Sequence, residues 1–555
     1  MSDVDWPAPG PGTWLQDRSH LPASTTALLQ EMFPAGIAQG MSESFAQFGS
    51  LLDTMQQRFV NGFPFMQPVP FDAPGPDGPR TPEYLGEEIG KRAAVAEAAF
   101  ANRIWRDIIR RWDEETKPAS IAAHRALADV DLAGLDDEAL RQHLHRCIAH
   151  TKAMWTQHHR HNGAALIPVG DFILHASEWT NRPPVPLFMV FDGWAPISSI
   201  VPPDLQPAIA ALRNDAEARA VLTSDATDDE VIATLRARIP EVDEWIRSCS
   251  FRIAAGFDLT NPCIIELPDL MRGRLLVALD HEHDQSRERA EALVNELRAE
   301  VPDEHRAEFD ELLGEARLVY RLRDERGIYS DASALGILRL ALIELGTRLA
   351  KRGRLAFMYD GLDVTSAEID SLLTGGAEPT AADITARVAR RKSLSAAGAP
   401  PFLGPPPEPP PPADGLPPSI ARVMASLGFV IQGVLGEAEA PVGDNQLVVG
   451  IGGAAGLFEG PACIVRNFDE LMMLKEGDVL VTSATGESFN AFLHLVGAIV
   501  TDHGSFASHA AIMGREMGFP AVVGTVNATS RIPRGAIVRV DGTAGTVEVV
   551  SVPDA

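Results

Sequence analysis

A histidine at the expected start of a helix is the first feature of this sequence that points to chemistry. The run Thr501–Gly524 reads TDHGSFASHAAIMGREMGFPAVVG, in which an apolar strand ending at Thr501 leads into a short loop with a glycine. Ser508 stands where a helix N-cap is expected, and its side chain can accept a bond from a backbone N–H of the first turn. His509 would then occupy the first helical position, beside the positive end of the helix. A phosphoryl group on this imidazole would be stabilised there.

The residues around His509 fit the handling of a phosphate. The field of the helix lowers the pKa of the imidazole, which keeps the ring neutral and nucleophilic near pH 7. Gly504 lets the backbone approach a phosphate closely, and the guanidinium of Arg515, further along the helix, could pair with an anion. A lone histidine at a helix start is also common as a capping or surface residue. The residue types alone leave both interpretations open.

The sequence around these residues predicts a compact α/β domain. From about residue 444 to 550, short β-branched runs such as LVVGIG, ACIV and GDVLVT are separated by Gly, Pro and Asp, which is typical of strands. Shorter helical segments are expected around 489–496 and 508–517. One strand, 497–501, leads directly into the loop before His509.

The preceding part of the chain predicts mainly helix. Apolar residues recur at helical spacing, and the richly apolar stretch 330–351 predicts a buried helix that ends near Gly353. The segment Pro400–Pro418, PPFLGPPPEPPPPADGLPP, predicts an extended, semi-rigid linker outside any packed core. We therefore expect a multidomain α plus α/β chain: a mainly helical domain over 1–395, a Pro-rich linker or hinge over 396–440, and a small α/β domain over 441–555.

The composition limits the partners. The chain of 555 residues has 48 Lys and Arg against 76 Asp and Glu, a formal charge of −28, which disfavours nucleic acid and anionic lipid as partners. Its four cysteines show no CxxC spacing, which argues against a disulfide framework or zinc ribbon and fits a reducing cytoplasm. No signal peptide and no apolar run of about 18 residues is visible. We expect a cytoplasmic protein without nucleic-acid or membrane partners.

The segment around His509 resembles the swivelling phosphohistidine domain of the phosphoenolpyruvate-utilising enzymes. The signature of that family has a Thr, a glycine-rich loop, Ser-His-Ala-Ala-Ile, Arg-Glu and Gly-x-Pro-Ala-Val-x-Gly. It stands here as Thr501, Gly504, Ser508–Ile512, Arg515–Glu516 and Gly518–Gly524. Ser505 departs from the second glycine that is usual in the family, which puts the loop geometry in question. The resemblance implies that His509 is phosphorylated, with Thr501, Gly504, Ser508 and Arg515 stabilising the phosphate.

Two further segments, Gly12–Phe33 and Leu322–Gly353, resemble more loosely the helical substrate domain of rifampicin phosphotransferases and their split relatives. We expect no ATP-grasp segment before residue 12 and no phosphoenolpyruvate-binding barrel after residue 555. The arrangement is most similar to the phosphohistidine and substrate subunit of phenylphosphate synthases and related cresol-phosphorylating two-component enzymes. The resemblance implies a separate ATP-grasp subunit that binds ATP and Mg²⁺, and no metal site in this chain.

That resemblance also implies a reaction. The β-phosphoryl group of ATP would pass to His509 and then to a small phenolic or alcohol substrate, leaving AMP and phosphate. A base for the acceptor hydroxyl could come from His158 and His161, which share a helix face in an aromatic-bearing region, although a core or surface pair is the alternative. Arg323 and Arg326 could steady the phosphoryl group or simply form surface ion pairs. A rifampicin-type antibiotic phosphotransferase and a phosphocarrier without a small substrate remain the rival functions.

Overall fold

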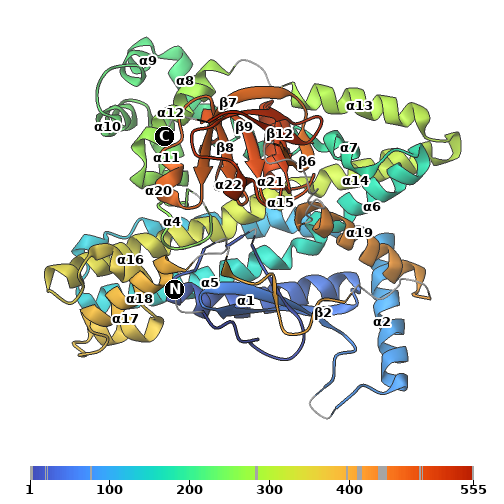
Figure 1. Ribbon diagram of the computed structural model, residues 1–555, viewed down its shortest axis with the longest axis horizontal. Helices are drawn as coiled ribbons and strands as arrows, with labels where there is room; N and C mark the ends of the chain where they lie inside the picture. Colours follow the sequence, from blue (N-terminus) through green and yellow to red (C-terminus); the bar gives the residue numbers. More distant parts are fainter. Residues whose placement is uncertain are drawn as a thin grey trace. The chain divides into compact units, whose positions relative to one another are not determined.

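The computed structural model describes residues 4–18, 20–21, 23–75, 78–254, 256–281, 285–394, 398–408, 415–435, 447–486, 489–490 and 492–552 (Figure 1). Parts of the expected linker and hinge, at 395–397, 409–414 and 436–446, lie outside the described residues. The chain forms two compact units. The first consists of Met1–Ala165, Phe257–Pro262 and Arg326–Ala425, and the second of Leu166–Gly256, Cys263–Glu325 and Ser426–Ala555.

The first unit is a set of helices that packs beside a small antiparallel sheet. Helix α5 packs against α1 and α16, and α1 packs against strand β2. The helices are α1 (Ala27–Phe48), α2 (Pro82–Ala101), α3 (Trp105–Arg111), α4 (Lys117–Ala128), α5 (Asp137–Arg160), α16 (Ser333–Lys351), α17 (Ser366–Leu373) and α18 (Ala381–Ser393). Two wider π-helical turns, η1 (Trp112–Thr116) and η7 (Gly327–Ala332), extend α3 and precede α16. The buried helix expected over 330–351 is confirmed as α16, and Gly353 takes a positive φ of 69° just after it.

The sheet of the first unit has the strand order β2-β3-β1-β4. Its strands are β1 (Trp14–Gln16), β2 (Leu52–Val60), β3 (Phe63–Pro70) and β4 (Phe402–Leu403). Asn61 and Gly62 join β2 to β3 with φ angles of 52° and 80°, as a two-residue hairpin turn requires. This hairpin was not expected within a mainly helical region.

Strand β4 corrects the prediction that Pro400–Pro418 stays outside the core. Phe402 and Leu403 pair with Leu15 and Trp14, and Leu403 is 5% exposed. These two residues carry the N–H groups that the neighbouring prolines lack, so they can join a sheet edge and bury their apolar side chains. Beyond the undescribed 409–414, the chain continues as α19 (Pro418–Leu435) rather than as an extended linker.

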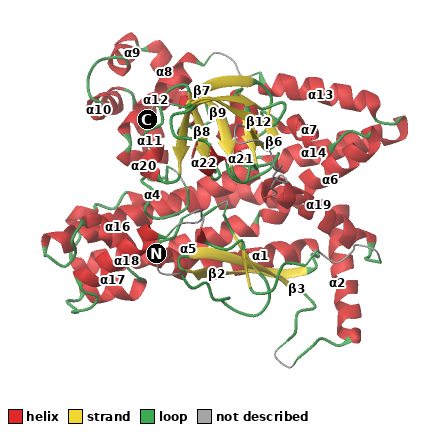
Figure 2. Ribbon diagram, viewed as in Figure 1, coloured by secondary structure: helices red, strands yellow, loops and turns green. Residues whose placement is uncertain are grey.

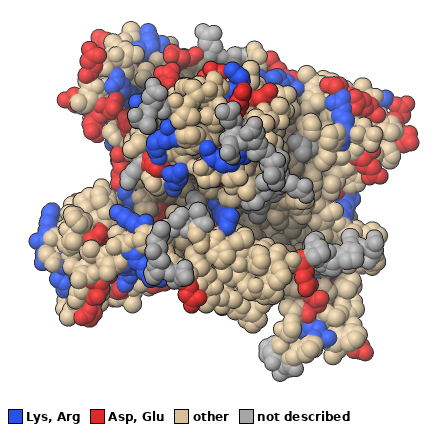
Figure 3. All heavy atoms as spheres, viewed as in Figure 1, with Lys and Arg blue, Asp and Glu red and all other residues tan. Residues whose placement is uncertain are grey.

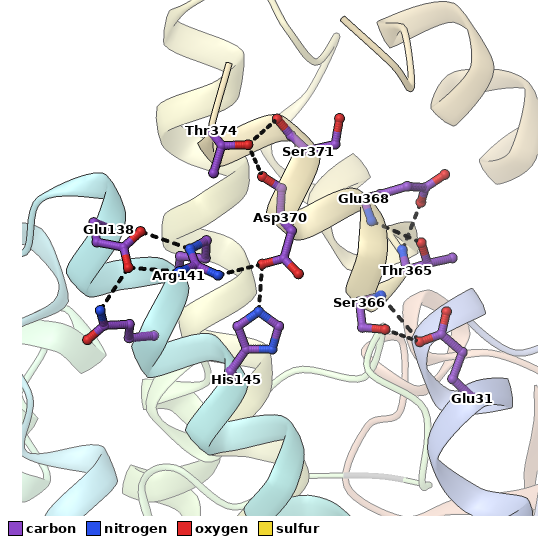
Figure 4. A network of polar contacts seen from close by, with 11 residues as sticks. Glu31, Glu138, Arg141, His145, Thr365, Ser366, Glu368, Asp370, Ser371 and Thr374 are labelled. Atoms are coloured by element: carbon purple, nitrogen blue, oxygen red, sulfur yellow. Dashed lines mark hydrogen bonds and ion pairs between the residues drawn. The ribbon is translucent and has the colours of Figure 1, made fainter. Parts of the chain in front are cut away.

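Exposed polar contacts hold α17 against its neighbours (Figure 4). Asp370 of α17 accepts from Arg141 at 3.1 Å and lies 2.6 Å from Nε2 of His145, both on α5. Ser366 at the start of α17 donates to Glu31 of α1 at 2.7 Å. Exposed pairs of this kind contribute at most about 1 kcal/mol each, so they fix the orientation of α17 more than its stability.

The second unit contains helices and an eight-stranded sheet (Figure 2). Its helices are α6 (Asn162–Thr180), α7 (Pro184–Leu187), α8 (Gln206–Asn214), α9 (Ala216–Leu222), α10 (Asp228–Arg238), α11 (Pro240–Cys249), α12 (Pro268–Asp280), α13 (Ser286–Glu300), α14 (Arg306–Tyr320), α15 (Leu322–Arg326), α20 (Phe468–Leu471), α21 (His509–Met517) and α22 (Ala528–Arg531). Helices α6, α15 and α19 begin in one unit and end in the other.

The strands of the large sheet are β5 (Leu447–Val449), β6 (Ile451–Ala454), β7 (Leu457–Val465), β8 (Asp478–Thr482), β9 (Val496–Thr501), β10 (Ala521–Val523), β11 (Ile537–Asp541) and β12 (Thr546–Ser551). Their order is β5-β12-β11-β7-β8-β9-β10-β6, and the four from β7 to β10 are parallel. Both faces of the parallel strands are buried. Leu480 and Ile499 face a core that includes α21 and α12, whereas Val481 and Val500 face the other side. The strands and helices expected for an α/β fold in this segment are therefore present, within a unit that also contains the helices over 166–325.

No helix among the described residues is long and apolar enough to cross a membrane. Acidic side chains gather where α13 is followed by α14 (Figure 3). The exposed members of this acidic group are Glu296, Glu300, Asp303, Glu304, Glu308 and Asp310.

Candidate active site

Two parallel strands place His509 at one edge of the large sheet. Strands β8 and β9 pair in register, with Thr482 opposite Thr501, so their carboxyl ends meet at the same edge. The loops that follow stay together because the N–H of Asp502 donates to Thr482 O at 3.0 Å, and that of His503 to Ser483 O at 2.9 Å. Helix α21 then begins with His509, as the sequence predicts.

His509 is 7% exposed, and both nitrogens of its imidazole have partners. Nδ1 lies 2.9 Å from Oγ1 of Thr485, and Nε2 lies 2.8 Å from Oδ1 of Asn490. Burial, and secondly the positive charge of Arg323, lower the pKa of His509 to about 3. The ring is therefore neutral at physiological pH. Since the amide oxygen of Asn490 can only accept, Nε2 carries the proton and Nδ1 accepts from the Thr485 hydroxyl. One partner has to withdraw before either nitrogen can bond to phosphorus.

Buried hydrogen-bond donors lie around the start of α21. Ser508 has the extended conformation of an N-cap, yet its hydroxyl makes no capping bond and has no partner among the described residues. Nη2 of Arg515 is also buried without a described partner. Gly504 takes a φ of 101°, a left-handed conformation that favours glycine. Together with the first N–H groups of α21, these donors could satisfy a phosphoryl group.

Two of the predicted phosphate-stabilising residues have other contacts. The hydroxyl of Thr501 donates to His503 O at 2.9 Å, and its own carbonyl accepts from Thr525, so Thr501 shapes the loop from a fully buried position. The guanidinium of Arg515 lies 3.2 Å from Asp192 through Nε and donates through Nη1 to Gly453 O at 2.8 Å. Because it is already paired with a buried carboxylate, Arg515 chiefly fixes α21 and offers only Nη2 to an anion.

Asp192 follows the short helical turn η3 (Phe188–Phe191) and belongs to a larger set of contacts on α21. The N–H of Gly193 donates to Glu516 at 2.6 Å, and the hydroxyl of Ser286 donates to Glu516 O at 3.2 Å. Arg289 donates to Arg515 O at 3.3 Å. We call these contacts the α21 clasp.

The two arginines proposed to steady the phosphoryl group belong to different units. Arg323 belongs to the second unit, where it donates to Ala507 O at 2.9 Å and lowers the pKa of His509. Arg326 belongs to the first unit and lies 3.4 Å from His158 O. Of the two, Arg323 shares a unit with His509 and acts on its pKa.

The two histidines proposed as a base are both on or next to α5 in the first unit. Nδ1 of His158 lies 2.7 Å from Oδ1 of Asp331, a fully buried carboxylate of η7. His161, by contrast, bonds back to Gln157 O at 2.8 Å, and its ring lies edge-on to Trp112 at 5.0 Å. Burial lowers the pKa of both histidines. Of the two, only His158 has a carboxylate partner among the described residues.

The sequence interpretation missed Thr485, Asn490, Asp192 and Asp331. The first two follow β8, and a signal for them existed: parallel neighbouring strands end at one edge, so the residues after β8 must lie near those after β9. Asp192 and Asp331 are far in sequence from their partners Arg515 and His158. Nothing in their local sequence marks them.

Replacing Arg323 by glutamine should raise the pKa of His509. The positive charge of Arg323 disfavours the imidazolium form, and the substitution removes that charge while burial continues to hold the pKa below 6.5. Titration of the His509 ring nitrogens by NMR measures the change. Arg321→Gln is the matched control, since Arg321 pairs with Glu325 at 2.9 Å on the same helical segment. A lowered or unaltered pKa in Arg323→Gln would contradict the electrostatic role.

Comparison with known proteins finds a family model that covers the segment around His509. Residues 474–545 match the family model of the PEP-utilising enzyme mobile domain. The uncharacterised phosphotransferase YvkC of Bacillus subtilis (strain 168) is 28% identical over 322 residues, 56% of this chain and 36% of that protein. The phosphoenolpyruvate synthase of Pyrococcus furiosus is 40% identical over 111 residues, 20% of this chain and 14% of the relative.

The rifampicin phosphotransferase of Bacillus subtilis is 36% identical over 128 residues, 23% of this chain and 14% of the relative. The chain thus spans 36% or less of the length of each of these relatives. The segment that holds Thr485, Asn490 and His509 therefore matches the PEP-utilising enzyme mobile domain, in a chain that is similar to phosphotransferases.

Proposed function

We propose that this chain is a phosphotransferase in which His509 accepts a phosphoryl group and passes it to a small hydroxyl compound. The observation that carries the proposal is the setting of His509. Its imidazole is neutral, lies at the first position of α21, and is accompanied by the buried donors of Ser508 and Arg515. The match of 474–545 to the mobile domain supports the same reading.

The chemistry follows from this setting. The attacking nitrogen is one that has lost its partner and bears a lone pair: Nδ1 once Thr485 withdraws, or Nε2 once Asn490 withdraws and its proton has passed to Nδ1, which can then donate to Thr485. Its lone pair attacks phosphorus, and the bond to the donor oxygen breaks. The first N–H groups of α21, the Ser508 hydroxyl and Nη2 of Arg515 then stabilise the oxygens of the phosphoryl group. Arg323 adds positive charge beside the ring. A covalent intermediate on histidine splits one difficult transfer into two easier ones.

The donor in this proposal is ATP, cleaved with Mg²⁺ on a separate ATP-grasp subunit to give AMP and phosphate. The resemblance to two-component phenylphosphate synthases supports it. Within the described ranges, no group of three or more His, Cys, Asp or Glu side chains is placed to hold a metal ion. The same resemblance assigns ATP and Mg²⁺ to the partner, where the metal would neutralise phosphate charge.

The acceptor in this proposal is a phenol or cresol, and the α/β part moves between donor and acceptor by a hinge within 396–440. The similarity to rifampicin phosphotransferase favours a second candidate, a larger polyhydroxylated antibiotic. A phosphocarrier that serves another protein is the third.

The test combines the full chain, an ATP-grasp partner, Mg²⁺ and β-labelled ATP with a panel of phenols and rifampicin. We expect acid-labile label at residue 509, followed by an aryl phosphate, AMP and phosphate. Label on the chain without transfer to any small compound would favour the phosphocarrier. Sustained product formation without a second protein would refute the separate donor subunit. Absence of label at His509 would refute the proposal as a whole.

A further inference from the structure

The end of α5 gathers buried polar atoms that lack partners. Nε1 of Trp155, Nε2 of His159, Oδ1 of Asn162 and Oδ2 of Asp331 are all buried without a hydrogen-bond partner among the described residues. They belong to one contiguous group, because the ring of His159 lies 4.9 Å from Trp155 and 4.8 Å from His158. Native proteins leave few such atoms unsatisfied, so a cluster of them marks a place where ordered water or the polar group of a ligand binds.

A π-helical turn places Asp331 in this group. Turns of this kind are rare and concentrate at functional sites. Three consecutive residues of η7 are each held by a side chain of α4 or α5. The contacts join Nε2 of His124 to Tyr329 O at 2.9 Å, Nε2 of Gln157 to Ser330 Oγ at 2.9 Å, and Nδ1 of His158 to Asp331 Oδ1 at 2.7 Å. The polar contacts thus fix Asp331, which has no exposed surface, against His158.

Aromatic rings line the same region. Trp155 stacks on Phe33 with the ring centroids 3.8 Å apart and the planes 16° apart. Phe257 lies edge-on to Trp155 at 6.0 Å, and His20 lies 5.9 Å from Phe257. Aromatic side chains beside a few polar atoms are typical of sites for small, largely apolar ligands with one polar group. A phenol has this chemistry: its ring packs on aromatic faces, and its hydroxyl both donates and accepts.

We propose that this group is the acceptor site, in which His158, oriented by Asp331, takes the proton from the hydroxyl of a phenol. The inference rests on the proposed function for the phosphoryl donor, but it assigns the site and the base independently. The N–H of Trp155 donates to the phenolic oxygen, and Nε2 of His159 and Oδ2 of Asp331 are the other polar atoms beside that oxygen. His158 is the catalytic residue and Asp331 is a positioning residue.

The transfer step balances. The phenolic oxygen forms a bond to phosphorus, and the P–N bond to His509 breaks, with its electron pair returning to the ring nitrogen. The phenolic proton passes to Nε2 of His158. The resulting imidazolium is stabilised by the carboxylate of Asp331 through Nδ1–H, the arrangement that a histidine base uses in other hydroxyl activations.

The charged surroundings give the site a pH dependence. Burial raises the pKa of Asp331 to about 8 and lowers that of His158, so the pair is neutral overall at lower pH. Loss of one proton leaves the Asp331 carboxylate bonded to Nδ1–H and a lone pair on Nε2, which is the basic form. Transfer should therefore become faster as the pH rises to about 8. The other titratable or charged groups that act on the pair are His20, His159, His161, Arg326 and, through His159, Asp17.

The test uses Asp331→Asn in the full chain, which keeps the volume of the side chain but removes its charge. We expect His509 to be labelled as in the wild type, whereas transfer from the labelled chain to phenol falls by about 100-fold, the size of a lost general base. The rise in rate toward pH 8 should disappear. Asp360→Asn is the matched control, a carboxylate of the same unit that is 7% exposed and caps a turn. It should leave both half-reactions and the pH profile as they are.

The results that would refute this acceptor site differ from those that would refute the proposed function. If His509 is labelled and Asp331→Asn transfers to phenol at the wild-type rate, the acceptor site is wrong and the carrier function stands. If Asp331→Asn does not fold, His158→Gln must show the same loss of transfer. Calorimetry with phenol is the independent measurement: the wild type should bind it, and Trp155→Phe, which removes one N–H, should bind it at least several-fold more weakly. Equal binding by both proteins would overturn the site even if no phosphoryl transfer were detected.

Discussion

Replacing His509 by alanine should reduce phosphoryl labelling of the chain to background while the fold persists. No other residue offers a neutral imidazole at the start of α21, and alanine is the best helix former. The measurement is acid-labile label after incubation with the ATP-grasp partner and β-labelled ATP. His503→Ala is the matched control, since His503 lies in the same loop and is similarly buried, and it should keep the label. Label retained by His509→Ala would refute the assignment.

The same substitution should make the protein less sensitive to acid. The pKa of His509 is about 3 in the folded chain and about 6.5 in the unfolded chain, so between these values only the unfolded chain binds the proton. The free energy of unfolding therefore falls as the pH drops below 6.5, by about 2 kcal/mol from this group at pH 5. This contribution is absent from His509→Ala. Chemical unfolding at pH 7 and pH 5 should show a smaller difference for the variant, and an equal or larger difference would contradict the lowered pKa.

Replacing Asp192 by alanine should make local opening of α21 much more frequent. Asp192 and Arg515 form an ion pair whose side chains are 4% and 8% exposed, and removal of one partner leaves a buried charge. Breaking such a pair costs about 3 kcal/mol or more, which corresponds to local opening about 100-fold more often. Hydrogen exchange of the α21 amides measures this opening directly.

The matched control for Asp192→Ala is Asp107→Ala. Asp107 pairs with Arg110 at 2.6 Å, but the two side chains are 47% and 49% exposed. Pairs in water contribute little, so exchange in the surrounding helix should hardly change. If the amides of α21 exchange at the wild-type rate in Asp192→Ala, the α21 clasp does not hold α21 in place.

The sequence predicted the parts of the site that lie in one short segment. The helix start at His509 and the strand that leads to it are local features, and both are present in the structure. The buried helix over 330–351 was also predictable, because its apolar side chains recur at helical spacing. Its first residues, however, form a π-helical turn. The polar contacts that hold that turn come from residues about 170 to 200 positions away in sequence.

Long-range pairing explains the other differences. Arg515 was expected to bind a phosphate, but its guanidinium forms an ion pair with Asp192, which is 323 positions away in sequence. Phe402 and Leu403 were expected in a linker, but β1 near the start of the chain supplies a strand for them. The hairpin at Asn61–Gly62 carried a readable turn signal within a region whose composition favours helix. The composition of the whole region favours helix, so it does not indicate the short sheet β2-β3-β1-β4 that the region contains.

The interleaving of the two units limits the motions that the chain can make. The polypeptide crosses between the units at 165/166, 256/257, 262/263, 325/326 and 425/426. Several covalent connections of this kind leave the two units few degrees of freedom for independent motion, and three of the crossings run through continuous helices, α6, α15 and α19. Only the crossing at 425/426 leads into the eight-stranded sheet. Displacement of His509 is therefore expected to proceed by release of that sheet from the helices of its own unit, with the Asp192–Arg515 pair as the contact that breaks.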